Sequence, residues 1–216
     1  MKILFFTLLP AIIVGCFFYF AQRFKDSKFF IAKAFGLGVL IAFPAGYLNT
    51  YVLQTFTNNN PINNNLLTGF FAGGLVEELL KFLALLFYLP TQKKLKKFDI
   101  VIFALFISLG FAVYENFGYV FQPTGASFEI AFIRAFTAVP MHIFNGIIMG
   151  YFFEFYSKTG DNKFLGFTVL MPIILHGSYN FFVSENLLIA KGIVLLQVFM
   201  ALLTFASTSF LLRFFS

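Results

Sequence analysis

The stretch LVEELLKFLALLF, residues 75–87, carries Glu77, Glu78 and Lys81 in a run that is otherwise apolar. A charged side chain at bilayer depth costs roughly 3 kcal/mol or more unless it is paired, neutralised or hydrated, so such residues are by default a functional-site hypothesis. The stretch therefore indicates both a membrane helix and the place where the chemistry of the chain is located.

The composition of the whole chain indicates an integral membrane protein. Of its 216 residues, 60% are hydrophobic and 11% are charged, and the apolar runs are long enough for helices of about 20 residues each. The sequence therefore predicts an all-α fold, a polytopic transmembrane helix bundle. Membrane segments and short loops account for the full length, so we expect a single integral-membrane domain over residues 1–216, multi-pass in the cell membrane.

The apolar periodicity predicts about seven spans. They fall at roughly 3–22, 31–56, 66–90, 98–121, 128–156, 164–184 and 187–212. The loops QRFKDSK, TQKKLKK and SKTGDNK are basic, whereas TNNNPINNN and QPTGAS carry no positive charge. The positive-inside rule then places the N-terminus outside and the C-terminus in the cytoplasm.

The same basic loops explain the net charge of +6, so no nucleic-acid partner is expected. TNNNPINNN itself is expected to be a solvated polar connector.

Further polar residues lie in the later spans. The ionisable ones are Glu115, Arg134, His142 and His176, and the amides near them are Asn116, Asn145 and Asn180. At 1.5 Å per helical residue, the carboxylates and histidines of four antiparallel spans fall at similar depths, in the middle to outer part of the membrane. We therefore expect them to share one hydrated cavity.

Spacing along the third span predicts how its charges pair. Lys81 is at i+4 from Glu77 and at i+3 from Glu78, so it reaches either carboxylate. Two adjacent carboxylates in a low dielectric resist ionising together, so one can hold a proton while the other acts as ligand or base. Arg134 is either the counter-ion of Glu115 or a side chain that extends to the outer interface.

Four motifs occur in order: VEELLK, FAVYEN, Arg134 followed by a Pro-x-His, and HGSYN. Together they resemble the PrsW family of intramembrane proteases and, more distantly, the CAAX prenyl protease and bacteriocin-immunity group. The resemblance covers about residues 66–184. Lys81 stands where the wider group has arginine, and Glu115 where the CAAX proteases have histidine, which favours the PrsW branch.

The resemblance implies a membrane-embedded peptidase in which the glutamate pair and the histidines are catalytic. It also implies a metal-dependent enzyme and a single-pass membrane protein as substrate. That substrate would be an anti-sigma factor, cleaved at site one on its extracytoplasmic side.

Two catalytic arrangements fit these residues. A catalytic zinc site has three protein ligands and an open position for water. His142, His176 and either Glu78 or Glu115 would supply the ligands of Zn²⁺, which leaves Glu77 as the general base. In a metal-free arrangement, Glu77 and His142 activate water while His176 and Asn180 stabilise the oxyanion.

The amide residues near the histidines supply support in either arrangement. Asn145 is at i+3 from His142 and Asn180 at i+4 from His176, so each amide can orient a ring from one turn away.

Two other classes of function remain open from the residues alone. A proton- or ion-coupled transporter also uses intramembrane glutamate, histidine and arginine, although such proteins normally show inverted repeats and none is evident here. A membrane scaffold or immunity protein would use the same polar residues only to hold helices together.

Overall fold

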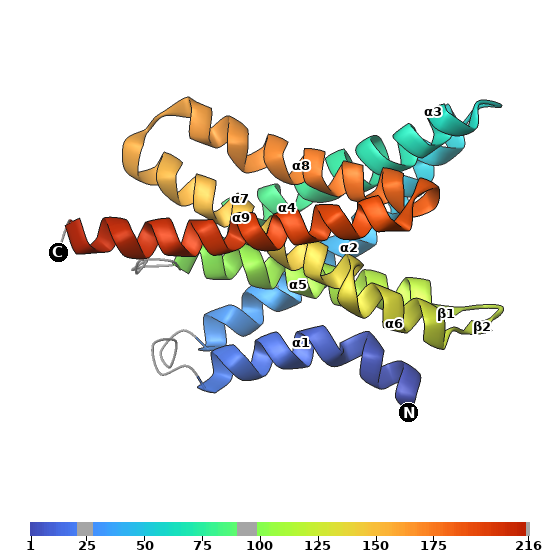
Figure 1. The fold of residues 1–216 in the computed structure, drawn as a ribbon, viewed down its shortest axis with the longest axis horizontal. Coiled ribbons are helices and arrows are strands. Elements are labelled where there is room, and N and C mark those ends of the chain that lie inside the picture. The colour runs from blue at the N-terminus through green and yellow to red at the C-terminus, as the bar shows by residue number, and fades with distance from the viewer. Residues whose placement is uncertain (21–27, 90–98, 215–216) are drawn as a thin grey trace.

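The chain folds as a helical bundle, which a computed structural model describes for residues 1–20, 28–89 and 99–214 (Figure 1). The helices are α1 (Lys2–Phe20), α2 (Lys28–Phe56), α3 (Pro61–Leu66), the π-helix η2 (Leu67–Glu77), α4 (Glu78–Tyr88), α5 (Asp99–Val120), α6 (Phe128–Phe136), α7 (Ala138–Thr159), α8 (Asn162–Glu185) and α9 (Leu187–Phe214). Strands β1 (Phe121–Gln122) and β2 (Gly125–Ala126) form a small antiparallel hairpin after α5.

Among the described residues, four helical segments are long and apolar enough to cross a membrane. They are Lys28–Phe56, Asp99–Val120, Phe128–Thr159 and Asn162–Val183, and two shorter apolar helices cover Lys2–Phe17 and Leu188–Met200. The all-α membrane bundle is therefore confirmed. The count of seven spans and the orientation of the termini stay predictions. The basic loops expected at 22–28 and 91–97 lie outside the described residues, apart from Lys28.

The two ends of the bundle differ in what they contain. The N-terminus, α3 and the β1–β2 hairpin lie at one end of the long axis, whereas the α7–α8 turn and the C-terminus lie at the other (Figure 1).

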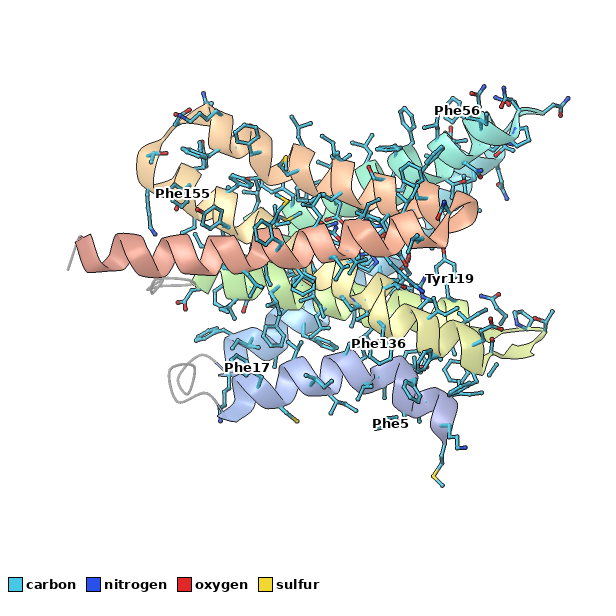
Figure 2. The ribbon with its side chains drawn as sticks, viewed as in Figure 1. Phe5, Phe17, Phe56, Tyr119, Phe136 and Phe155 are labelled. Carbon is cyan, nitrogen blue, oxygen red and sulfur yellow. The ribbon has the colours of Figure 1, made fainter. Side chains whose placement is uncertain are left out.

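Several phenylalanines are exposed. Phe5, Phe17, Phe56 and Phe136 are labelled in Figure 2, and each is more than half exposed. Exposed phenylalanines of this kind suit contact with lipid chains.

Helix α5 is the central element, buried along most of its length and packed between α2 and α7. Its approach to α2 is close because both helices carry glycine at the contact. A Cβ at Gly38 would overlap the carbonyl of Ile107, and one at Gly110 would overlap the carbonyl of Phe35. The α2–α5 packing is therefore fixed by small residues, as is common between membrane helices.

The third predicted span begins earlier than expected and is not α-helical throughout. The chain enters α3 at Pro61, and the side chain of Asn60 caps it by accepting from the N–H groups of Ile62 and Asn63. Proline at the first helical position and asparagine at the N-cap favour a helix start. Part of the predicted TNNNPINNN connector is therefore exposed helix.

The π-helix η2 ends at Glu77, directly before Glu78. Its i→i+5 bonding turns each residue through a smaller angle than the roughly 100° of an α-helix. Both glutamates are consequently buried, at 4% and 0% relative exposure. Local π-helical structure is frequent at functional sites, and here it directs two adjacent carboxylates into the bundle.

The span expected as one helix over 128–156 is instead divided into α6 and α7 by Thr137, whose φ of −129° and ψ of −74° are not helical. Pro140 lies in the first turn of α7, where its missing N–H costs no helical hydrogen bond. Thr137 Oγ1 donates to the carbonyl of Ile133 at 2.8 Å and accepts from Tyr179 at 2.9 Å. The break is therefore held by polar contacts within the bundle.

The predicted orientation has a direct test. In a Cys16→Ser background, Asn59→Cys at the α3 end is expected to react with a membrane-impermeant thiol reagent on intact cells. Asn162→Cys in the α7–α8 turn is expected to react only after lysis, because the lysines around it oppose translocation. Both positions are exposed. The reverse pattern would invert the orientation.

Candidate active site

Glu78 lies at the centre of a buried polar cluster. Its Oε1 accepts from Lys81 Nζ at 2.8 Å and from His176 Nδ1 at 2.7 Å. An ionised carboxylate only accepts, so His176 Nδ1 carries the proton and the lone pair is on Nε2. Glu78 thus fixes the tautomer and orientation of His176, as carboxylates do for metal-binding histidines.

His142 of α7 lies edge-on to His176, with ring centroids 4.8 Å apart. Lys81 Nζ donates to its Nδ1 at 2.8 Å, because an ammonium has no lone pair to accept with. His142 Nε2 then donates to Glu115 Oε2 at 2.9 Å. Lys81 therefore joins the Glu78–His176 pair to the His142–Glu115 pair in one network.

Arg134 of α6 is the counter-ion of Glu115, one of the two alternatives that the sequence left open. Its Nη2 donates to Glu115 Oε2 at 2.7 Å, and its Nε donates to Asn116 Oδ1 at 2.9 Å. Asn116 in turn donates to the carbonyl of Thr7 in α1, and the guanidinium stacks on the ring of Tyr119. Contacts with Glu115, Asn116 and Tyr119 thus fix the position of the Arg134 side chain.

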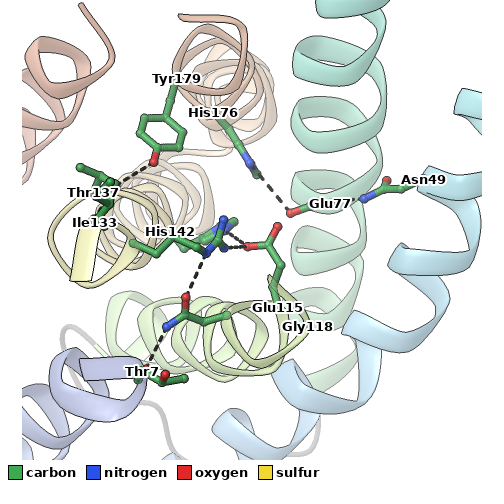
Figure 3. A network of polar contacts seen from close by, with 12 residues as sticks. Thr7, Asn49, Glu77, Glu115, Gly118, Ile133, Thr137, His142, His176 and Tyr179 are labelled. Carbon is green, nitrogen blue, oxygen red and sulfur yellow. Dashed lines mark hydrogen bonds and ion pairs between the residues drawn. The ribbon is translucent and has the colours of Figure 1, made fainter. Parts of the chain in front are cut away.

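Glu77 is held from the other side of the cluster. Asn49 Nδ2 of α2 donates to Glu77 Oε1 at 2.9 Å, and Figure 3 shows Glu77 between Asn49 and His176. Glu77 Oε2 and His176 Nε2 are both buried and have no hydrogen-bond partner in the part of the chain that the structure describes, and they are 3.9 Å apart. Unpartnered buried polar atoms are uncommon and call for an explanation, such as an ion or a catalytic role.

A metal ion would satisfy these atoms. Glu77, His142 and His176 each offer one donor atom, and the three atoms lie within 4.8 Å of one another. Two imidazoles and a carboxylate are a donor set that zinc uses in catalytic sites. Both ring nitrogens of His142 are engaged, by Lys81 and by Glu115, so His142 would bind the ion in place of one of these contacts. With that exchange, the residues present fit a metal centre.

The cluster borders a cleft of about 450 Å³ between α2 and α5. Two of its lining residues are carboxylates, Glu77 and Glu115. Glu78 is fully buried behind them. A molecule in the cleft therefore meets Glu77 and Glu115, whereas Glu78 acts through Lys81 and His176.

The structure brings most of the predicted site residues together. The network unites eight of them: Glu77, Glu78, Lys81, Glu115, Asn116, Arg134, His142 and His176. The sequence assigned the carboxylate ligand to Glu78 or Glu115, whereas the group of three donors contains Glu77. Their catalytic and metal-binding roles stay predictions.

The two predicted amides occupy different places. Asn145 donates to the carbonyl of Pro172 at 3.3 Å and accepts from Gln197 of α9 at 2.8 Å, so it links α7, α8 and α9. Asn180 lies against η2, where a Cβ at Gly73 would overlap its Nδ2. The rings are oriented by Glu78, Glu115 and Lys81, not by these amides.

The sequence did not single out Asn49 as a site residue. Its only local signal is that it is one of two amides, with Gln54, in the last part of a largely apolar helix. The contact with Glu77 joins residues 28 apart in the chain, so it emerges only when α2 and η2 are packed together.

Comparisons with known proteins identify the family of this chain. Residues 27–207 match the family described as PrsW family intramembrane metalloprotease. Protease PrsW of Oceanobacillus iheyensis is 31% identical over 88% of this chain and 88% of its own length. Protease PrsW of Clostridioides difficile is 33% identical over 71% and 65%, and that of Bacillus subtilis is 29% identical over 81% and 79%. No solved structure matches the chain.

The family match covers every residue of the network on α2, η2, α4, α5, α6, α7 and α8. The matched region also contains the four helical segments that are long and apolar enough to cross a membrane. The chain therefore belongs to the PrsW family of intramembrane metalloproteases and is a multi-pass membrane protease.

Proposed function

We propose that the chain hydrolyses a peptide bond of a single-pass membrane protein in the α2–α5 cleft, with a metal ion held by Glu77, His142 and His176. The observation that carries the proposal is the pair of unpartnered buried atoms, Glu77 Oε2 and His176 Nε2, 3.9 Å apart beside the cleft. Zn²⁺ is the metal that this donor set suits best.

The surrounding residues hold the site in place. When bound, the metal would polarise the scissile carbonyl and lower the pKa of a water molecule. Glu78 keeps the lone pair of His176 on Nε2 by accepting from Nδ1. Lys81 offsets the charge of Glu78 at 2.8 Å, and Asn49 fixes the Glu77 carboxylate. Each support is a direct hydrogen bond, so the site is preorganised.

Glu115 is placed to accept a proton from the attacking water and to pass it to the leaving amine. It lines the cleft and contacts His142 and Arg134. A water that loses its proton to Glu115 attacks the carbonyl carbon of the substrate. The C–N bond then breaks, and the proton passes from Glu115 to the leaving amine. Arg134 holds the Glu115 carboxylate in place, with Nη2 at 2.7 Å from Oε2.

The proposed substrate is a single-pass protein of the anti-sigma-factor kind, cleaved at site one on the extracytoplasmic side. Three features support this. The relatives are named Protease PrsW. The cleft is lined by residues near the end of α2 and by β1, at the end of the bundle that contains α3 and the hairpin. The charge of the loops predicts that this end is extracytoplasmic.

The proposal is tested by reconstituting the purified chain in liposomes with a panel of single-pass bacterial membrane proteins, anti-sigma factors among them. Mass spectrometry of the products is expected to show one cleavage near the extracytoplasmic end of a span, and His176→Ala is expected to abolish it. If no single-pass protein is cleaved, or if His176→Ala cleaves at the wild-type rate, the proposal fails.

The packing of η2 against α8 gives a further prediction. Gly73→Ala is expected to lower kcat/KM by about a hundredfold, because its methyl group would displace Asn180 and approach His176 Nε2 to 3.4 Å. Gly36→Ala in α2 is the matched control, since a Cβ there meets nothing within 4 Å. Equal rates for the two variants would show that the position of α8 is not critical.

A further inference from the structure

The cleft between α2 and α5 has two chemically different walls. On the α2 side the lining includes Ala42, Gly46, Asn49 and Leu53, which recur at helical spacing along one face. On the α5 side it is largely aromatic, with Tyr114 among the lining residues. The walls meet at Glu77 and Glu115, so the cleft leads from the outer end of the bundle to the catalytic cluster.

Asn49 is the polar side chain on the α2 wall that connects the cleft to this cluster. Its Nδ2 donates to Glu77 Oε1 at 2.9 Å. Its Oδ1 is buried and has no hydrogen-bond partner among the described residues. A buried acceptor without a donor is destabilising, and a donor supplied by a bound molecule would remove that cost.

A peptide backbone in extended form supplies such a donor. In a helix the backbone N–H groups are bonded within the segment, and in a membrane they stay so. An unwound segment has N–H groups free, and its side chains alternate between two sides. One side would meet the small residues of α2, and the other would meet the aromatic wall of α5.

We propose that the α2–α5 cleft binds the substrate as an unwound, extended segment, and that Asn49 aligns it by accepting a backbone N–H at Oδ1 while its Nδ2 holds Glu77. This inference rests on the proposed protease function and names the substrate conformation and the residue that recognises it. Asn49 is a positioning residue toward Glu77 and a binding residue toward the substrate.

The length of the cleft sets the position of the scissile bond. Ala42 and Asn49 both line it, and their separation along α2 corresponds to roughly 10 Å of helix. An extended segment covers that distance in about three residues. The N–H bound by Asn49 is therefore expected within about three residues of the scissile bond.

The first test uses a synthetic transmembrane peptide that covers the cleaved bond of a single-pass protein cleaved by the wild type. A backbone ester replaces one N–H at a time on either side of that bond. At one position the ester is expected to lower kcat/KM about tenfold, through KM, in the wild type. In Asn49→Ala the same ester is expected to have no effect.

Asn49→Asp separates the two roles of this residue. It keeps an acceptor oxygen but places a second carboxylate beside Glu77, so kcat is expected to fall while the ester effect remains. Asn59→Ala, an exposed loop change, is the control and is expected to behave as the wild type. An ester effect of equal size in the wild type and in Asn49→Ala would overturn the inference and leave the protease function standing.

A second test does not depend on catalysis. In a Cys16→Ser, Glu77→Gln background, Leu53→Cys on the cleft wall is expected to form a disulfide with a cysteine in the same peptide. Leu40→Cys, on an exposed face of α2, is the control and is expected to form none. Equal crosslinking at both positions would overturn the inference. Absence of Glu77-dependent cleavage in the first test would overturn the proposed function, and the inference with it.

Discussion

Replacing Glu77 by glutamine is expected to lower kcat/KM for peptide-bond cleavage at least about a thousandfold while leaving the fold intact. The change replaces the carboxylate whose Oε2 lies 3.9 Å from His176 Nε2 with an amide, which binds zinc much more weakly than a carboxylate does. The bundle should tolerate it, because a charge buried without full pairing costs stability where it lies. Cleavage in liposomes and thermal unfolding in detergent measure the two effects.

Glu129→Gln is the matched control for this change. Glu129 is an exposed glutamate in the first turn of α6, away from the cleft. Its variant is expected to cleave at the wild-type rate. A Glu77→Gln protein that also cleaves at that rate would exclude Glu77 from the catalytic centre, and one that fails to fold would give Glu77 a structural role.

Replacing Lys81 by methionine is expected to have the largest effect on stability, about 3–5 kcal/mol of the free energy of unfolding. Lys81 is fully buried and donates to Glu78 and His142 at 2.8 Å each. Its Nζ also lies 4.2 Å from the ring centroid of Phe111. Without it, the buried Glu78 carboxylate keeps its hydrogen bond from His176 and has His142 Nδ1 at 4.0 Å, but no cation beside it. Thermal unfolding in detergent should show the loss.

Two comparisons identify the cause of that loss. Lys33→Met removes an exposed lysine of α2 that contacts the ring of Phe29, and it is expected to change stability by less than about 1 kcal/mol. The double variant Lys81→Met with Glu78→Gln removes both charges and is expected to recover part of the stability. If the double variant were less stable than Lys81→Met alone, the uncompensated charge of Glu78 would not be the cause.

The membrane bundle and the shared polar cluster were predictable because both follow from the cost of charge in lipid. That cost made Glu77, Glu78, Glu115 and the two histidines conspicuous in the sequence. Since each of them needs partners, it also predicted that they meet, as they do. The pairing of Arg134 with Glu115 was one of two alternatives that the sequence left open, and the structure shows it.

The details that the sequence did not predict depend on packing between distant segments. The π-helix before Glu78 changes the direction of adjacent side chains, and the apolar pattern of the third span contains no signal for it. The break at Thr137 has a local cause in Pro140, which entered the sequence prediction only through the Pro-x-His motif and not as a helix boundary. Asn49 reaches Glu77 through the close approach of α2 to the rest of the bundle.

The residues that orient the His142 and His176 rings also could not be predicted from the sequence. Amides one helical turn away were expected to orient the rings, because helical neighbours are the contacts that spacing reveals. The rings are instead held by Glu78, Glu115 and Lys81, which lie on other helices. Asn145 is used to join α7 to α8 and α9.

The metal content of the purified chain tests the central claim most directly. If Glu77, His142 and His176 hold a metal, the wild type should contain about one equivalent of zinc, and each of Glu77→Gln and His176→Ala should contain far less. Chelation should stop cleavage, and added zinc should restore it. Occupancy should also fall on acidification, because neutral imidazole is the form that binds. Cleavage that persists in thoroughly metal-free protein, while still requiring Glu77 and His176, would contradict the metal centre and favour direct activation of water by these residues.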